Sequence, residues 1–162
     1  MKIILAILGF LGIGAIQAVE LNYDHAILLD AEDLAEGGIN EAIEAIQVDL
    51  NRLKIPVKLS AVKETHGEIG SIEYKSKTIV IYDSKKENND HLWALATYAL
   101  FFIVNDQLAN SGFKLYAVNG GNDLVGFLLK DNEYRAAIKV PDIDNRPYLP
   151  SDKPPMFGYP EP

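Results

Sequence analysis

The sequence predicts an α+β protein with a single domain, in which an antiparallel sheet packs on two helices. Two patterns support this class. Apolar residues recur at helical spacing in two segments, and each segment is followed by three short runs rich in β-branched and aromatic residues. The order is therefore two αβββ-like units. The 162 residues include no cysteine, so burial without disulfides must hold the fold together, and a chain of this length can bury enough surface.

Residues 1–18 are predicted to be a signal peptide. Met1-Lys2 forms a short positive region, and no charged residue occurs from Ile3 to Ile16. Such a run has the length of a secretory apolar region and is too short to span a bilayer. Ala18 offers a small residue for cleavage. We expect a periplasmic or secreted protein with no membrane span after removal of the signal.

Residues 19–140 are predicted to be the α+β domain. Its first part is a short lead with a candidate strand at residues 26–29, and Asp30 then has the position of a helix N-cap. The main helix follows Gly37-Gly38 and ends before Pro56. One apolar stripe marks its buried face: Ile39, Ala42, Ile43, Ile46, Leu50 and Leu53.

Three strands are expected after this helix. Residues 57–62 alternate apolar and polar side chains, and residues 63–67 are typical of a loop. Residues 71–74 and 78–82 are rich in β-branched and aromatic residues, with a short polar turn between them. This pair is predicted to form a hairpin.

The second unit begins with a helix that is apolar on most sides. It covers residues 92–104, with Asp90 as the expected N-cap and Gly112 as the terminator. A three-stranded meander over residues 113–118, 123–129 and 134–140 is expected to follow, with polar turns between the strands.

Residues 141–162 are predicted to be a Pro-rich extended tail. Seven of the eight prolines lie here, which excludes a helix or an interior strand. The tail is expected to cover a sheet edge, and its aromatic residues leave a binding role open: Tyr148, Phe157 and Tyr159.

The charge balance narrows the class of partner. The chain has 23 acidic and 15 basic residues, for a formal net charge of −8. Such a chain repels nucleic-acid phosphates and anionic lipids, and no basic patch offsets this. We therefore predict no nucleic-acid partner. An acidic surface suits solubility, or docking onto another protein, with a basic protein favoured by charge.

No pattern in the sequence predicts a reaction. Cysteine is absent, and no serine lies in a G-x-S-x-G or S-x-x-K motif. The three histidines have no metal-ligand spacing, and the acidic residues do not follow the calcium-loop pattern. We therefore predict no catalytic residue, no metal and no cofactor.

Five polar residues are candidates for ligand or partner contact. Asp30 and Asp33 belong to an acidic cluster that also suits helix capping. Asn119, Asn122 and Asp123 flank two glycines in a turn whose backbone N–H groups and side chains could form a polar contact surface. Capping and turn formation are the competing interpretations.

The leading functional hypothesis is an exported, non-enzymatic protein-binding module, such as an inhibitor or an immunity-type protein. One alternative is a small hydrolase that uses Asp or Glu with a histidine, His25, His66 or His91, in a pocket between the sheet and the acidic N-terminal segment. Another is a small-molecule carrier with an internal pocket lined by Tyr116, Phe127 and Tyr134.

Overall fold

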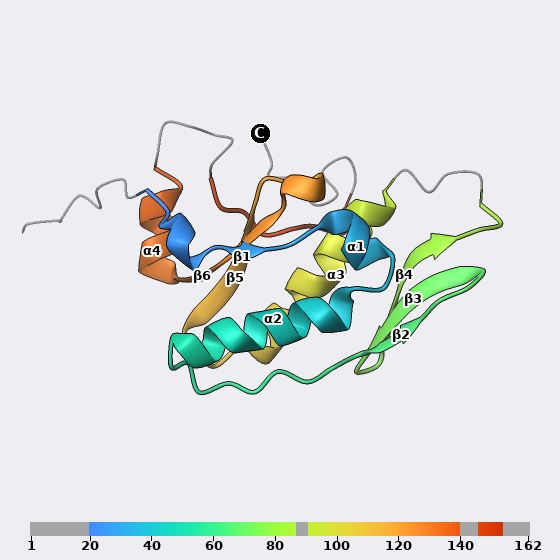
Figure 1. The fold of residues 1–162 in the computed structure, drawn as a ribbon, viewed down its shortest axis with the longest axis horizontal. Coiled ribbons are helices and arrows are strands. Elements are labelled where there is room, and N and C mark those ends of the chain that lie inside the picture. Colours follow the sequence, from blue (N-terminus) through green and yellow to red (C-terminus); the bar gives the residue numbers. More distant parts are fainter. Residues whose placement is uncertain (1–19, 87–90, 140–145, 154–162) are drawn as a thin grey trace, which may run out of the picture.

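The elements are those of an α+β protein, as the sequence predicts. The structure, a computed structural model, describes residues 20–86, 91–139 and 146–153 (Figure 1). The predicted signal peptide, residues 1–18, lies outside this part of the chain. The described helices are η1 (Tyr23–His25), α1 (Ala31–Ala35), α2 (Ile39–Arg52), α3 (Leu92–Gln107), η2 (Gly121–Asp123) and α4 (Asp131–Ala137). The described strands are β1 (Ile27–Leu28), β2 (Lys63–Thr65), β3 (Ile69–Tyr74), β4 (Lys77–Asp83), β5 (Phe113–Val118) and β6 (Val125–Lys130).

The strands form two three-stranded antiparallel sheets, with α3 between them. One sheet has the order β1-β6-β5 and the other the order β2-β3-β4. Helix α3 contacts β4 on one side and β5 on the other, and it also packs against α1 and α2 (Figure 1). Because both sheets cover α3, the following apolar residues of its middle and end are fully buried, whereas Trp93 near its start is 40% exposed: Ala96, Ala99, Leu100, Ile103 and Val104.

Helices α1 and α2 have the N-cap and the buried apolar stripe that the sequence predicts. The Asp30 carboxylate accepts the backbone N–H groups of Glu32 at 2.8 Å and Asp33 at 3.3 Å, so the expected N-cap is confirmed. Helix α2 buries the predicted stripe except Leu53, which is partly exposed. Its N-terminus is capped from outside the helix, because the Glu64 carboxylate accepts from the N–H groups of Ile39 and Asn40, each at 3.2 Å.

The hairpin of β3 and β4 is also confirmed. Tyr74 pairs with Lys77, and Lys75 at the turn has a φ of 53°. Helix α3 begins after His91, which occupies the N-cap position without a side-chain cap bond. The expected cap, Asp90, lies outside the described residues.

The predicted strand at residues 57–62 is wrong. This segment is extended but belongs to no sheet, and β2 instead occupies part of the predicted loop at residues 63–67. Three side-chain amides replace the partner strand. The Leu59 N–H donates to Gln47 at 2.7 Å, the Ser60 N–H to Gln107 at 2.6 Å, and the Val62 N–H to Asn40 at 2.8 Å. Each amide also donates to a backbone carbonyl of the segment.

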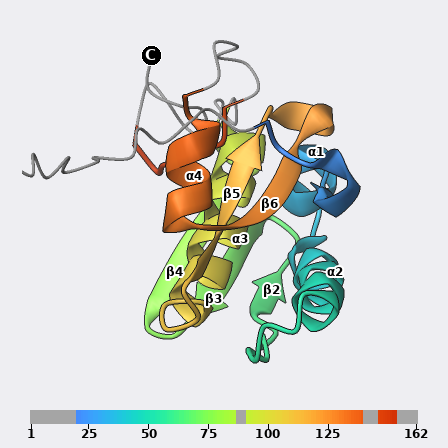
Figure 2. The same ribbon diagram turned by 90° about the vertical axis from the view of Figure 1, so that its left-hand side faces the viewer.

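The predicted third strand of the meander, residues 134–140, is wrong as well. Residues 134–137 belong to α4, and residues 138–139 form a turn after it. The Glu133 carboxylate accepts the Lys130 N–H at 2.7 Å, and Arg135 pairs with Asp131 at 2.8 Å one helical turn away. Helix α4 lies on the side of β5 and β6 opposite α3 (Figure 2). The third place in the sheet belongs to β1.

The tail is described only over residues 146–153. Tyr148 pairs with Ala117 of β5 by two backbone hydrogen bonds of 2.8 Å. The rest of the predicted Pro-rich tail lies outside the described residues. None of the helices in the described part of the chain is long and apolar enough to cross a membrane.

Candidate functional site

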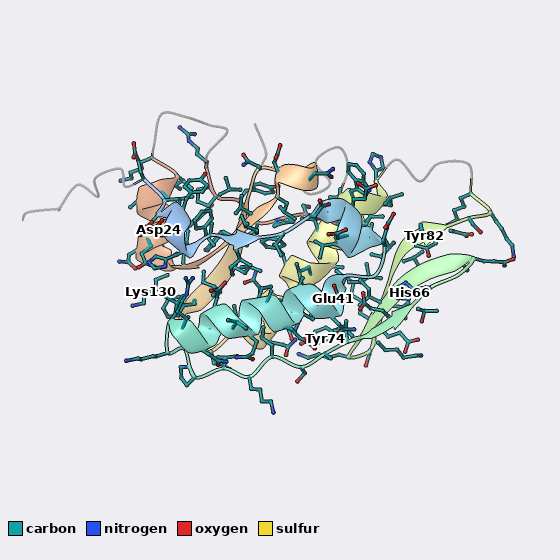
Figure 3. The ribbon with its side chains drawn as sticks, in the orientation of Figure 1. Asp24, Glu41, His66, Tyr74, Tyr82 and Lys130 are labelled. Atoms are coloured by element: carbon teal, nitrogen blue, oxygen red, sulfur yellow. The ribbon has the colours of Figure 1, made fainter. Side chains whose placement is uncertain are left out.

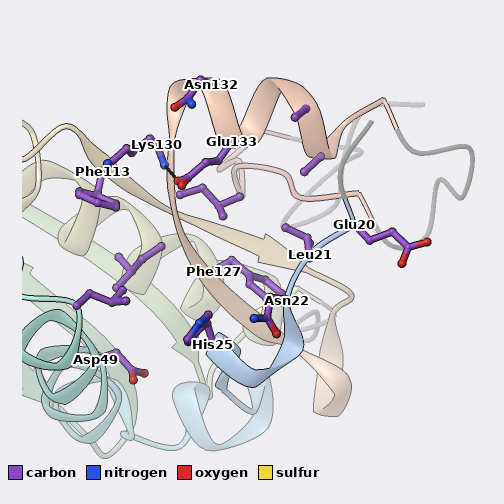
Figure 4. Close-up of a pocket in the computed structure, with 15 residues that line it drawn as sticks. Glu20, Leu21, Asn22, His25, Asp49, Phe113, Phe127, Lys130, Asn132 and Glu133 are labelled. Carbon is purple, nitrogen blue, oxygen red and sulfur yellow. Dashed lines mark hydrogen bonds between the residues drawn. The ribbon is translucent and has the colours of Figure 1, made fainter. Parts of the chain in front are cut away.

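A groove of about 690 Å³ lies beside β6, on the side where β1 stops. It is bounded by the lead into β1, the C-terminal end of α2, β6 and the start of α4 (Figure 4). Apolar side chains line much of it: Leu21, Leu53, Phe113, Phe127, Leu128 and Leu129. Its polar lining is Glu20, Asn22, His25, Asp49, Lys130, Asn132 and Glu133. The volume and mixed lining are typical of binding sites.

The groove exists because the chain before β1 turns away from β6. The Asn22 side chain accepts the Asp24 N–H at 3.0 Å, which starts the 3₁₀ turn η1. The Tyr23 ring then packs edge-on against Phe127, with centroids 5.2 Å apart. As a result, the strand pairing of β1 begins only at Ile27.

This departure leaves part of the β6 edge without a strand partner. Ile27 pairs with Gly126, and the Leu29 N–H donates to the Leu124 carbonyl at 3.0 Å. Alternate residues of β6 therefore direct their backbone groups toward β1, and Leu128 is next in that series. Among the described residues, none pairs with Leu128 on this side.

The far end of the groove is closed by the junction of β6 and α4. The Lys130 N–H is already bonded to the Glu133 carboxylate, and the Lys130 ammonium lies 5.1 Å from the centre of the Phe113 ring. Ala136 and Ala137 of α4 line the same wall and are small enough to leave space.

The charge of the groove is mainly negative. Glu20, Asp49 and Glu133 face it, against Lys130 and His25. Asp49 also pairs with Arg52 at 2.8 Å. In the described residues no hydrogen bond or ion pair joins His25 to a carboxylate. Of the three histidines that the hydrolase hypothesis names, His25 lines the groove, whereas Asp30, Glu32 and Asp33 do not.

The other histidines lie elsewhere. His66 follows β2, and its ring packs so closely on Gly37 that a Cβ there would lie 2.5 Å from a ring carbon. In Figure 3, His66 stands beside the β2-β3-β4 sheet, away from Asp24 and Lys130. His91 precedes α3. Within the described ranges, no group of three or more His, Asp or Glu side chains could hold a metal ion.

The three aromatic residues of the carrier hypothesis do not line one pocket. Phe127 faces the groove, whereas the Tyr116 and Tyr134 rings stack on each other with centroids 4.3 Å apart. Burial raises the pKa of the Tyr116 hydroxyl, and the nearby Tyr134 adds to this shift. These two tyrosines therefore pack α4 onto the sheet.

The five residues predicted for ligand or partner contact lie outside the groove. Asp30 caps α1, and Asp33 is exposed on that helix. Asn119 has a φ of 58°, and its carbonyl accepts the Tyr148 hydroxyl. Asn122 and Asp123 are exposed in η2. Because α1 contacts η2, the two groups share one side of the molecule (Figure 1).

An acidic face covers α1 and α2. Residues 20–54 contain nine acidic residues but only Arg52 and Lys54 as strong bases. Among the described residues, Asp49 is the one of these nine acids that forms an ion pair; the acids of α1, its C-cap and α2 that form none are Glu32, Asp33, Glu36, Glu41 and Glu44. Val48, on the outward side of α2, is 66% exposed, and Leu28 of the adjacent β1 is 84% exposed. Two exposed apolar side chains thus accompany the negative charge.

Sequence reasoning missed the groove. It treated residues 134–140 as a strand, and this removes the helix that forms one wall. A signal was present in the sequence, since Asp131 and Arg135 are spaced for an ion pair along a helix. No sequence signal indicated that η1 would turn away from β6. The chain matches no protein-family model, no curated protein and no solved structure.

Proposed function

We propose that the mature chain is an exported, non-enzymatic module that binds a basic protein. The observation that carries this proposal is the charge distribution, in which the face of α1 and α2 holds acids without ion pairs among the described residues, beside exposed Val48 and Leu28. Complementary charge accelerates encounter, and central apolar side chains supply contact area. An inhibitor or an immunity-type protein is the kind of module that such a surface suits.

The β3-β4 half of the molecule differs in charge from the face of α1 and α2. Residues 55–86 contain six lysines and four acids, so the β3-β4 half is slightly basic. Glu68 and Glu73 there are paired with Lys85 at 2.7 Å and Lys63 at 2.8 Å. A partner steered by charge would therefore approach α1 and α2.

The test is capture of a partner by residues 19–162 from periplasmic and secreted extracts. The variant Glu41→Lys/Glu44→Lys reverses two exposed charges of α2. We expect at least about tenfold weaker capture, and loss of capture by the native protein at high salt. The control Glu68→Lys/Glu73→Lys makes the same change of net charge on β3 and its flank. If both variants bind equally well, or if salt has no effect, the acidic face is not the binding surface.

Export is a separate part of the proposal. Expression of all 162 residues should yield a mature protein outside the cytoplasm whose first residue is Val19, as read by N-terminal sequencing. Leu8→Arg places a charge in the apolar run and should trap the chain in the cytoplasm. A full-length protein that accumulates in the cytoplasm in both cases would contradict export.

A small-molecule ligand is the second candidate, and the groove is the observation that favours it. Its volume of about 690 Å³ falls in the range of sites for small ligands, and Phe127 from the carrier hypothesis lines it. A screen of ligand classes by thermal shift, repeated with Asn132→Trp to obstruct the groove, tests this function. A stabilising ligand whose effect the obstruction removes would support the carrier.

A further inference from the structure

The groove beside β6 has the form of an acceptor for one added strand. β6 is paired with β5 along its whole length, but with β1 only at Val125 and Gly126. The backbone groups of Leu128 on the open side face the groove, and the Lys130 N–H beyond it is bonded to Glu133. On this side the open backbone groups are those of Leu128, about 7 Å along the strand from the closed Lys130 N–H. An unpaired strand edge of this kind is a template for pairing with an extended chain.

The two walls suit the alternating side chains of a strand. The Leu128 side chain belongs to the core that faces α2 and α3, whereas Phe127 and Leu129 face the opposite side of the sheet. A strand laid against Leu128 would direct alternate side chains toward Asp49 and Leu53 at the end of α2, and toward α4. Each side of such a strand therefore meets apolar surface within the groove.

Charge decides which extended chain fits. Glu20, Asp49 and Glu133 line the groove, and its one lysine, Lys130, lies over the Phe113 ring. An acidic segment would meet like charge from Glu20 and Glu133, whereas lysine or arginine side chains would meet opposite charge there. The charge of Asp49 is offset by Arg52 at 2.8 Å. The acids of α1 and of the first half of α2 have the same sign of charge as the groove, whereas Arg52 and Lys54 lie at and just after the end of α2 beside it.

We propose that an extended basic segment of the protein partner binds in this groove as a strand added to β6, by hydrogen bonds to the backbone of Leu128. The inference rests on the proposed function, because the segment that binds in the groove is part of the basic protein partner. It adds a binding mode, strand addition, and a second contact region, distinct from the acidic face.

The test uses a capped seven-residue peptide in which Lys and Val alternate, titrated into residues 19–162. We expect chemical-shift changes at groove residues and slower hydrogen exchange of the Leu128 amide when the peptide is bound. Methylation of the alternate peptide nitrogens on one edge removes backbone donors, and replacement of Lys by Glu removes charge complementarity. Each change should weaken binding at least about tenfold. No binding, or equal binding of the N-methylated peptide, would overturn the inference.

Two protein variants connect the peptide result to the partner. Asn132→Trp places a bulky side chain at an exposed position of the groove wall, and Ser76→Trp does the same at the tip of the β3-β4 hairpin as a control. Amide spectra establish that both are folded. Asn132→Trp should lose the peptide and weaken partner capture, while Ser76→Trp changes neither. If Asn132→Trp captures the partner normally, the groove inference fails and the proposed function stands. If the peptide binds but charge reversal on α2 leaves capture unchanged, the acidic-face proposal fails alone.

Discussion

In the β1-β6-β5 sheet, the outer edge of β5 is closed by hydrogen bonds, whereas the central strand β6 has an open segment on its β1 side. Along the outer edge of β5, the Ser111 hydroxyl accepts the Phe113 N–H at 3.0 Å, the Asn105 amide bonds both backbone groups of Leu115, and Tyr148 pairs with Ala117. Along β6, pairing with β1 ends at Gly126, and Leu128 faces a groove. A closed edge prevents association with other chains, whereas an open segment permits it. The difference indicates that an added strand would find unpaired backbone groups at β6 and not at β5.

The largest expected effect comes from opening the closed edge. Asn105→Ala removes an amide that donates to the Leu115 carbonyl at 2.9 Å and accepts its N–H at 2.7 Å. Leu115 is fully buried, so its two backbone groups would be left unpaired, at a cost of about 2–4 kcal/mol in the free energy of unfolding. Urea denaturation measures it. The exposed Asn51→Ala should change stability by less than about 0.5 kcal/mol. Equal effects of the two variants would contradict the role of Asn105.

A smaller effect should be visible in the native protein without mutation. The amides of Gly126 and Phe127 are expected to bond β1 and β5 respectively, whereas Leu128 turns its N–H toward the groove. Hydrogen exchange at Leu128 should therefore be at least about tenfold faster than at these two neighbours, a difference of about 1.4 kcal/mol. Equal protection at all three amides would show that the β6 edge is closed after all.

The smallest expected effect concerns Asp106, a charged residue of α3 that binds the β3-β4 hairpin, in contrast to the uncharged Asn105 that binds β5. Asp106, next to Asn105, accepts the Tyr74 hydroxyl at 2.6 Å and the Lys75 ammonium at the hairpin turn. The hydrogen bonds from Lys75 and then from Tyr74 lower the pKa of the Asp106 carboxyl. A lowered folded-state pKa gives stability that is present above the unfolded pKa of about 3.9 and is lost as pH falls through the folded value.

Asp106→Asn should therefore lower the melting temperature slightly at neutral pH and reduce the loss of stability on acidification, as followed by thermal denaturation between pH 7 and pH 2. The pair is partly exposed to solvent, which keeps the effect small. The Asn105→Ala variant should retain the pH dependence of the native protein. An unchanged acid response in Asp106→Asn would show that the carboxylate contributes nothing to hairpin docking.

The sequence by itself determined the elements whose signals are local. The apolar stripe of α2, the β-branched runs of β3 and β4, the apolar length of α3 and the capping by Asp30 all act within a few residues of the chain. For the same reason the turn at Asn119 was predictable, since its positive φ depends on the residues of the turn itself. These elements were enough to establish the α+β class.

The tertiary structure alone decided the rest. Residues 57–62 have a strand pattern, but Asn40, Gln47 and Gln107 take their backbone bonds, from as far as 47 residues away. The groove likewise depends on where η1 leaves β6 and where α4 packs. The physical reason is common to both cases. A backbone group in an extended segment forms its hydrogen bond with whichever group the folded chain brings near it. Sequence spacing does not specify which group that is.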